Sequence, residues 1–148
     1  MPGLAAGLRA TVRAVVTSAD TAEAMGSGNL PVLATPRLLA LAEAATVAAV
    51  APQLADGLTT VGTAVSLEHR KASPLGAEIV VEAELTEVDG RRLVFGFIAR
   101  PAGTDADGTD AVGTDAVGTD AGVVVGAGTV ERVVVDGARF LARTLSSP

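Results

Sequence analysis

Two side chains are the main candidates for chemistry, because each occupies a costly position in an apolar stretch. Glu43 is the one acid within the nearly continuous apolar run of residues 36–51. His69, the only histidine, ends the alternating segment VGTAVSLEH. A carboxylate in an apolar cleft can act as a base or a nucleophile, and an imidazole that titrates near neutral pH can transfer protons. The two residues together therefore suggest a catalytic site.

Both residues also have structural explanations. Glu43 could reach solvent or pair with an arginine at the edge of a helix, since buried acids are usually paired. His69 could be a hydrogen-bonded structural residue. Thr35 is expected to be a helix N-cap, with Pro36 at the first helical position. A threonine there also lies beside free backbone N–H groups that can stabilise an oxyanion, so the two roles of Thr35 are compatible.

Hydrophobic periodicity predicts the elements that position these residues. The run 36–51 is expected to be a helix that Pro52 ends, and its lack of a polar face predicts burial on most sides. A short helix is expected within 136–148, and Asp89-Gly90 favours a hairpin turn. Strands are predicted over 9–17, 59–69, 78–88, 92–100 and 122–135. In the second of these strands, simple alternation places one set of residues on the same face: Val61, Thr63, Val65, Leu67 and His69.

The order of these elements favours the α+β class, with one antiparallel sheet wrapped around one apolar central helix. A helix hidden on all sides needs more cover than one sheet supplies, which predicts a homodimer. The length of 148 residues fits a single domain spanning 1–148. Residues 103–122 form a five-residue GTDAx repeat, expected to be a disordered loop insertion that can be deleted over 105–121 without loss of folding or activity. Calcium binding by this repeat is the less favoured alternative, since such a loop offers few convergent oxygens.

Composition excludes several classes of function. The net charge of −6 and the three aromatic residues argue against nucleic-acid binding. The absence of cysteine excludes disulfides and thiolate sites, and one histidine excludes a multi-histidine metal centre within the chain, so no cofactor is expected. Arginines interrupt the N-terminal segment, and Glu43 and Pro52 break the longest apolar stretch. We therefore expect neither a signal peptide nor a membrane span, and a cytoplasmic protein.

A set of motifs in order resembles the fluoroacetyl-CoA thioesterase type of hotdog-fold protein. It comprises Ala-Thr before the central helix, a glutamate eight residues on, a Gly-Thr-Ala strand that ends in histidine, a Pro-Leu-Gly turn, a Gly-Arg-Arg-Leu hairpin and a final Gly-Thr-x-Glu-Arg strand. The resemblance covers residues 30–100 and 122–140. It implies a homodimeric hotdog fold and hydrolysis of a short-chain acyl-CoA to the free acid and coenzyme A.

The resemblance also implies roles for five residues. Thr35, Glu43 and His69 take the catalytic positions, the backbone N–H of Gly62 lies near the thioester carbonyl, and Arg132 is the arginine of the last strand, expected to bind substrate. Candidates for the phosphates of coenzyme A are Arg70, Lys71, Arg91, Arg92, Arg132, Arg139 and Arg143.

The segment before the helix limits the substrate prediction. It reads MGSGNLPVL and lacks the phenylalanines that help the fluoroacetyl enzyme to select its substrate. A different short acyl group is therefore expected. Two alternatives remain: a non-catalytic hotdog module that binds an acyl-CoA or another apolar ligand, and a structural dimerisation domain in which Glu43 only pairs with an arginine.

Overall fold

The computed structural model describes residues 3–103 and 123–146, so the repeat, which begins at residue 103, lies almost entirely outside the described residues. Two single-turn 3-10 helices flank the longer elements, Ser18–Asp20 and Ala51–Gln53. The other elements are β1 (Arg9–Val15), α1 (Ala22–Met25), α2 (Thr35–Val50), β2 (Leu58–His69), β3 (Glu78–Asp89), β4 (Arg92–Pro101), β5 (Gly126–Asp136) and α4 (Gly137–Ser146).

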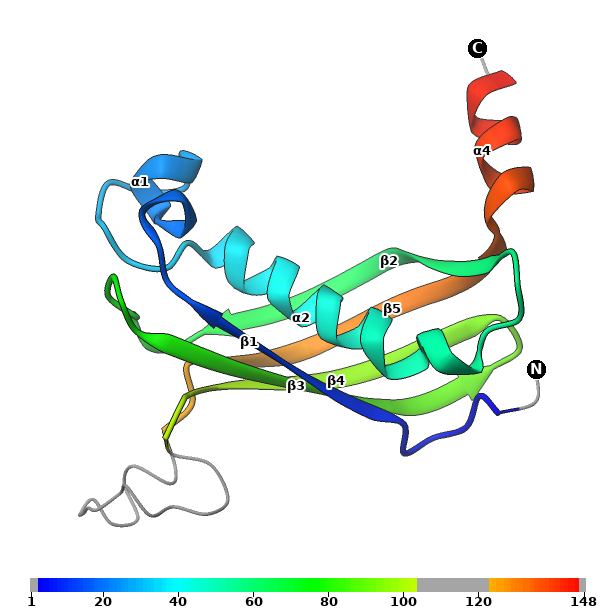
Figure 1. Ribbon diagram of the computed structural model, residues 1–148, viewed down its shortest axis with the longest axis horizontal. Coiled ribbons are helices and arrows are strands. Elements are labelled where there is room, and N and C mark those ends of the chain that lie inside the picture. The colour runs from blue at the N-terminus through cyan, green and yellow to red at the C-terminus, as the bar shows by residue number, and fades with distance from the viewer. Residues whose placement is uncertain (1–2, 104–122, 147–148) are drawn as a thin grey trace.

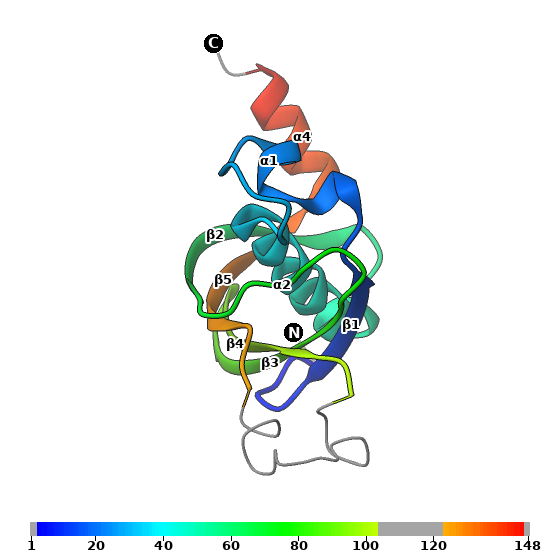
Figure 2. The same ribbon diagram turned by 90° about the vertical axis from the view of Figure 1, so that its left-hand side faces the viewer.

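A five-stranded antiparallel sheet in the order β1-β3-β4-β5-β2 curls around α2 (Figure 1). The end-on view in Figure 2 shows strands on three sides of this helix. The core lies between them, where Leu38 of α2 and Phe95 of β4 are fully buried. Burial of such side chains from water is the main source of stability for a layer of this kind. The expected α+β arrangement of one sheet around one helix is confirmed.

The start of α2 differs from the prediction. Ala34, in extended conformation, is the N-cap, and Thr35 is the first helical residue, with Pro36 following it. The N–H of Leu38 donates to the carbonyl of Ala34 at 3.0 Å, which brings the helix start one residue earlier. Thr35 as the N-cap was therefore wrong, and its hydroxyl is free for another partner.

The last strand also begins later than predicted, at Gly126 rather than residue 122. The carbonyl of Val125 accepts from the N–H groups of both Arg70 and Lys71, at 2.7 and 3.2 Å. These two bonds connect Val125 to the loop that follows β2, in place of the regular antiparallel hydrogen bonds between β2 and β5. The predicted hairpin between β3 and β4 is confirmed, with Gly90 at a φ of 61°, a conformation that glycine adopts readily.

One side of α2 stays uncovered in the single chain. Beyond its first turn, the exposed residues of α2 recur at helical spacing and are small or apolar: Ala40, Ala44, Val47 and Ala48. The sheet therefore supplies only part of the cover that an apolar helix needs. Among the described residues, no helix is both long and apolar enough to cross a membrane.

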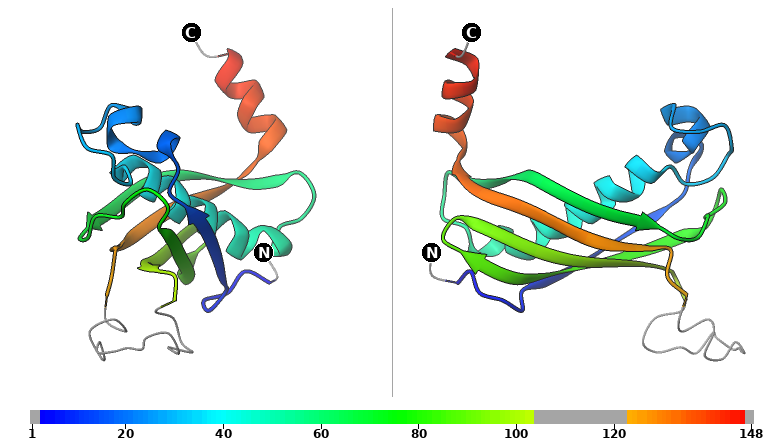
Figure 3. Two further views of the ribbon diagram at one scale, coloured as in Figure 1. Left: turned by 60° about the vertical axis from the view of Figure 1, so that its left-hand side comes forward. Right: turned by 180° about the vertical axis from the view of Figure 1, so that it is seen from behind.

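The C-terminal helix α4 stands away from the body of the molecule (Figure 3). None of its residues is buried. Two bonds fix its base: the N–H of Gly137 donates to the carbonyl of Gly57 at 2.9 Å, and Asp136 Oδ1 accepts from the N–H of Arg139 at 3.0 Å. In the view from behind, the outer face of the sheet carries no helix.

Candidate active site

Glu43 points from the middle of α2 toward Arg132 of β5. Its Oε2 lies 3.2 Å from a terminal nitrogen of Arg132, and 37% of its side chain is exposed. Arg132 is only 7% exposed and donates from Nε to Thr60 Oγ1 at 2.8 Å and from its other terminal nitrogen to the carbonyl of Thr60 at 3.1 Å. Burial lowers the pKa of Arg132, and the neighbouring carboxylate of Glu43 opposes this. The arginine thus holds the half-exposed carboxylate in one orientation.

Gly62 of β2 faces the same carboxylate. A Cβ placed on this glycine would lie 2.6 Å from Glu43 Oε2 and 3.5 Å from the Arg132 guanidinium. The first distance is too short for any side chain, so only glycine allows the carboxylate to approach the strand backbone this closely. Glu43, Gly62 and Arg132 therefore form one cluster.

Thr35 and His69 form a second cluster at the start of α2. Thr35 Oγ1 and His69 Nδ1 share a hydrogen bond of 2.8 Å. The other ring nitrogen, Nε2, is buried and has no hydrogen-bond partner among the described residues. Burial lowers the pKa of His69, against a weaker opposing effect of the Lys71 backbone. The imidazole is therefore largely neutral at pH 7 and presents an unused polar atom, which is typical of functional sites.

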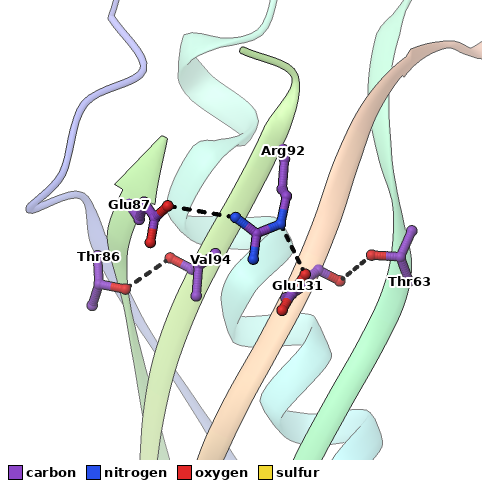
Figure 4. A network of polar contacts seen from close by, with 6 residues as sticks. All are labelled: Thr63, Thr86, Glu87, Arg92, Val94 and Glu131. Carbon is purple, nitrogen blue, oxygen red and sulfur yellow. Dashed lines mark hydrogen bonds and ion pairs between the residues drawn. The ribbon is translucent and has the colours of Figure 1, made fainter. Parts of the chain in front are cut away.

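A bulge in β2 sets the faces on which these residues lie. Gly62 pairs with Arg132 but Ala64 pairs with Glu131, so Thr63 is an extra residue. The hydroxyl of Thr63 donates to the carbonyl of Glu131 at 3.3 Å, on the side of the sheet that points away from α2 (Figure 4). Because a bulge shifts the alternation by one residue, Gly62 and His69 both face α2.

Because of the bulge, Val61 and Thr63 lie on a different face of β2 from the one that was predicted. Val61 pairs with Val133 on the outer face, whereas His69 pairs with Gly126 in the row that faces α2. Simple alternation had placed Val61 and Thr63 with His69, and it failed because it cannot account for an inserted residue.

Arg92 links the β2–β5 bulge to a second bulge on the outer face. Its guanidinium contacts Glu131 at 3.0 Å and Glu87 at 3.4 Å (Figure 4). Thr86, at the register shift of β3, donates to the carbonyl of Val94 at 3.0 Å. These contacts connect β3, β4 and β5 on the outer face, near the position of Gly62. Arg92, like Arg70 and Arg132, is engaged by carboxylates and is a weaker candidate for a phosphate than the sequence suggested.

The two clusters are separate within one chain. Thr35 and Glu43 lie eight residues apart on α2, which corresponds to about 12 Å along the helix axis. No hydrogen bond or ion pair in the described part of the chain joins Glu43 to His69. The structure therefore brings Thr35 to His69, and Glu43 to Gly62 and Arg132, but not the two groups to each other.

Thr35 and His69 open on a cavity of about 240 Å³. Its wall toward α1 consists of small and aliphatic residues: Ala22, Ser27, Val32 and Leu33. This segment is fastened by an ion pair of 2.9 Å between Arg37 and Asp20. The segment before α2, which the sequence shows to lack aromatic residues, thus forms part of the wall of a cavity next to the histidine.

Sequence reasoning missed two residues of this region. Thr60 is 8% exposed and binds Arg132 twice, and Thr63 forms the bulge. Both are threonines in a strand rich in such residues, so no feature of the sequence distinguished them. Their roles depend on the register between β2 and β5, which only the structure supplies. Among the described residues, no group of three histidine, aspartate or glutamate side chains is placed to hold a metal ion.

Comparisons with known proteins agree with this arrangement. The family described as fluoroacetyl-CoA-specific thioesterase, FlK, matches residues 16–138. The fluoroacetyl-CoA thioesterase of Streptantibioticus cattleyicolor is 36% identical over 112 residues, which cover 76% of this chain and 67% of the relative. A solved structure of FlK is 31% identical, with a TM-score of 0.78 and 99% of each chain covered. A hot-dog-like protein from Thermanaerovibrio acidaminovorans shares the fold at 18% identity, with a TM-score of 0.75 over 95% of this chain and 90% of that one.

The sheet wrapped around α2 is a hotdog fold, and the chain is a thioester hydrolase of the acyl-CoA thioesterase class. Within that class it belongs to the fluoroacetyl-CoA thioesterase family. The predicted family, fold and reaction class are thereby confirmed.

Proposed function

We propose that the chain hydrolyses a short, non-fluorinated acyl-CoA, with Glu43 as the catalytic carboxylate. One observation carries the proposal: a buried arginine holds a half-exposed carboxylate against the backbone of Gly62, in a thioesterase fold. A carboxylate so placed can accept a proton from water, or attack the thioester carbonyl itself. In the first route the water oxygen adds to the carbonyl carbon, the carbon–sulfur bond breaks, and the proton held by Glu43 passes to the departing thiolate. In the second route the carbon–sulfur bond breaks to leave a mixed anhydride on Glu43, which a water molecule then hydrolyses while a proton from that water passes to the thiolate. Both routes give free acid and coenzyme A.

The remaining site residues assist Glu43. His69 is held by Thr35 through Nδ1, and its buried, unpartnered Nε2 is the ring atom left for a hydrogen bond that assists proton transfer once substrate and water enter the site. The backbone N–H of Gly62 helps to stabilise the oxyanion. Arg132 is too buried to bind a phosphate and instead positions Glu43, with Thr60 as its second partner.

A homodimer is part of the proposal, and the edges of the sheet support it. The edge strand β1 carries Arg9 and Arg13, charges of the kind that prevent edge-to-edge pairing. The opposite edge strand, β2, is twelve residues long and has five consecutive exposed residues, 62–66, without a charge. Val65 is 48% exposed there. A second copy paired along β2 covers this edge.

Such a pairing also completes the site. An antiparallel β2–β2 pair centred between Val65 and Ser66 places Gly62 of one copy opposite His69 of the other. Glu43 and Gly62 of one chain then face Thr35 and His69 of the second, which bridges the separation of about 12 Å along α2 within one chain. Each dimer would hold two composite sites.

The residues of the cavity wall indicate which acyl group the substrate carries. Ala22, Val32 and Leu33 offer an aliphatic surface without an aromatic ring, so selection of fluoroacetyl over acetyl is not expected. A cytoplasmic location is also proposed, since acyl-CoA thioesters are intracellular metabolites.

The test is release of free thiol from acetyl-, propionyl-, butyryl- and fluoroacetyl-CoA, followed with a thiol reagent. We expect turnover of the first two with a kcat/KM at least equal to that for fluoroacetyl-CoA. A hundredfold preference for fluoroacetyl-CoA would contradict the proposed acyl group. Saturable acyl-CoA binding without thiol release would instead favour a non-catalytic binding module.

A further inference from the structure

A cavity outside the catalytic clusters gathers positive charge at the base of α4. It has a volume of about 340 Å³, within the range of small-molecule sites. Arg91, from the β3–β4 turn, and Arg139 and Arg143, from α4, line it together with a single carboxylate, Asp136. The cavity therefore carries net positive charge in a chain whose net charge is −6.

These three arginines have no carboxylate partner among the described residues, as is also true of Arg100 of β4, which does not line the cavity. Six arginines form ion pairs within the described part of the chain: Arg9, Arg13, Arg37, Arg70, Arg92 and Arg132. No such pair involves Arg91, Arg139 or Arg143, and Arg91 donates only to the carbonyl of Val134 at 3.2 Å. Unpaired guanidinium groups that converge on one cavity are suited to phosphate oxygens, which they bind in bidentate geometry.

An aromatic ring accompanies this charge. Phe140 lines the same cavity and is 40% exposed, whereas Phe95 and Phe97 lie in the core. It is thus the one aromatic side chain of the chain that a ligand can reach. The aliphatic side chains of Val133 and Val135 complete the wall. An exposed ring beside arginines can stack against a nucleobase.

The cavity also lies at a suitable distance from the thioester site. Arg132 and Asp136 are four residues apart on β5, which corresponds to roughly 13 Å along the strand. The pantetheine arm of coenzyme A has about as many backbone bonds as four residues and spans roughly 15 Å when extended. The length of the arm therefore matches the distance along β5 from Glu43 to α4. The arm has to pass the end of the sheet, because Arg132 faces α2 whereas Val133 and Val135 lie on the outer face.

We propose that Arg91, Arg139, Arg143 and Phe140 bind the phosphorylated adenosine end of coenzyme A. The arginines bind its phosphates, and Phe140 stacks on its base. This inference rests on the proposed function, because it assumes that the thioester lies at Glu43. From the phosphate candidates that the sequence offered, it selects the three arginines that line one cavity.

The test compares two thioesters in the double variant Arg139→Gln/Arg143→Gln. Acetyl-CoA carries the nucleotide, whereas acetyl-pantetheine lacks it. We expect the ratio of kcat/KM for acetyl-CoA to that for acetyl-pantetheine to fall at least tenfold in the variant. The double variant Arg9→Gln/Arg13→Gln, which removes the same charge from β1, should keep the wild-type ratio. An unchanged ratio in the α4 variant, or an equal fall in the β1 variant, would overturn the proposal.

A binding measurement separates this proposal from the hydrolysis itself. Calorimetry with adenosine 3′,5′-bisphosphate should show binding to the wild type and at least tenfold weaker binding to the α4 variant, whether or not thioesters are hydrolysed. Inorganic phosphate should bind far more weakly. Equal affinity for phosphate and the bisphosphate would reduce the cavity to a general anion site and overturn the nucleotide assignment. The melting temperature should stay unchanged, since α4 has no buried residue.

Discussion

Thr35 Oγ1 lies 2.8 Å from His69 Nδ1, so one hydrogen bond joins the first residue of α2 to the last residue of β2. This bond orients the imidazole and leaves Nε2 as its only unused nitrogen. The hydrogen bond to His69 gives Thr35 a role other than the N-cap role that the sequence predicted.

Replacing Thr35 with valine should therefore impair catalysis more than folding. The variant keeps the shape of the side chain but releases the imidazole, and we expect kcat to fall about tenfold to a hundredfold. Thr35→Ser, which keeps the hydroxyl, should retain most of the activity. Steady-state kinetics of the two variants test this prediction. Equal losses of kcat in Thr35→Val and Thr35→Ser would show that the hydroxyl group is not required.

The pKa of His69 predicts a dependence on pH. Burial lowers this pKa from its ordinary value of 6.5, so the folded protein favours the neutral imidazole more than the unfolded chain does. The resulting stability is fully present above pH 6.5 and is lost as pH falls from there through the lowered pKa of the folded state. Activity that needs the neutral imidazole should decline over the same acidic range.

The measurement is the melting temperature of the wild type and of His69→Gln between pH 8 and pH 5. The wild type should lose more stability on acidification than the variant. Parallel curves for the two proteins would show that His69 does not titrate with a lowered pKa.

Replacing Gly62 with alanine should displace the Glu43 carboxylate, because the new methyl group would lie 2.6 Å from its Oε2. We expect kcat/KM to fall at least tenfold, as small displacements of catalytic groups have large effects. Gly96→Ala is the matched control, since its methyl group would meet only Thr86 Cγ2 at 4.0 Å. Equal kinetics in the two alanine variants would mean that the close approach of Glu43 to Gly62 is not needed.

Arg132→Gln should reduce both stability and activity. The change removes the ion pair with Glu43 and two hydrogen bonds to Thr60, and should lower the free energy of unfolding by about 3 kcal/mol. Glu43→Gln keeps an oxygen for Arg132 and should cost less stability while abolishing turnover. Urea denaturation measures both. A larger loss of stability in Glu43→Gln than in Arg132→Gln would contradict the proposed positioning role.

The sequence predicted the elements and their order because periodicity is a local property. The residues 36–51 had to form an apolar helix, and Asp89-Gly90 had to turn. What it could not supply was the register between strands far apart in the chain. The bulge at Thr63 and the choice of Arg132 as the partner of Glu43 depend on the pairing of β2 with β5, in which Gly62 lies opposite Arg132, 70 residues further along the chain. That Arg91 and Arg139 line the same cavity could not be predicted either, because it depends on the folded structure.

The central claim is that Glu43 of one chain and His69 of another act on the same thioester. It is tested most directly by mixing the inactive variants Glu43→Gln and His69→Ala, allowing the chains to exchange, and measuring thiol release from acetyl-CoA. Half of the dimers would then pair two different chains, each with one intact composite site, so about a quarter of the wild-type activity should return. No recovery in an exchanged mixture would contradict the claim, because sites built within one chain would all remain damaged.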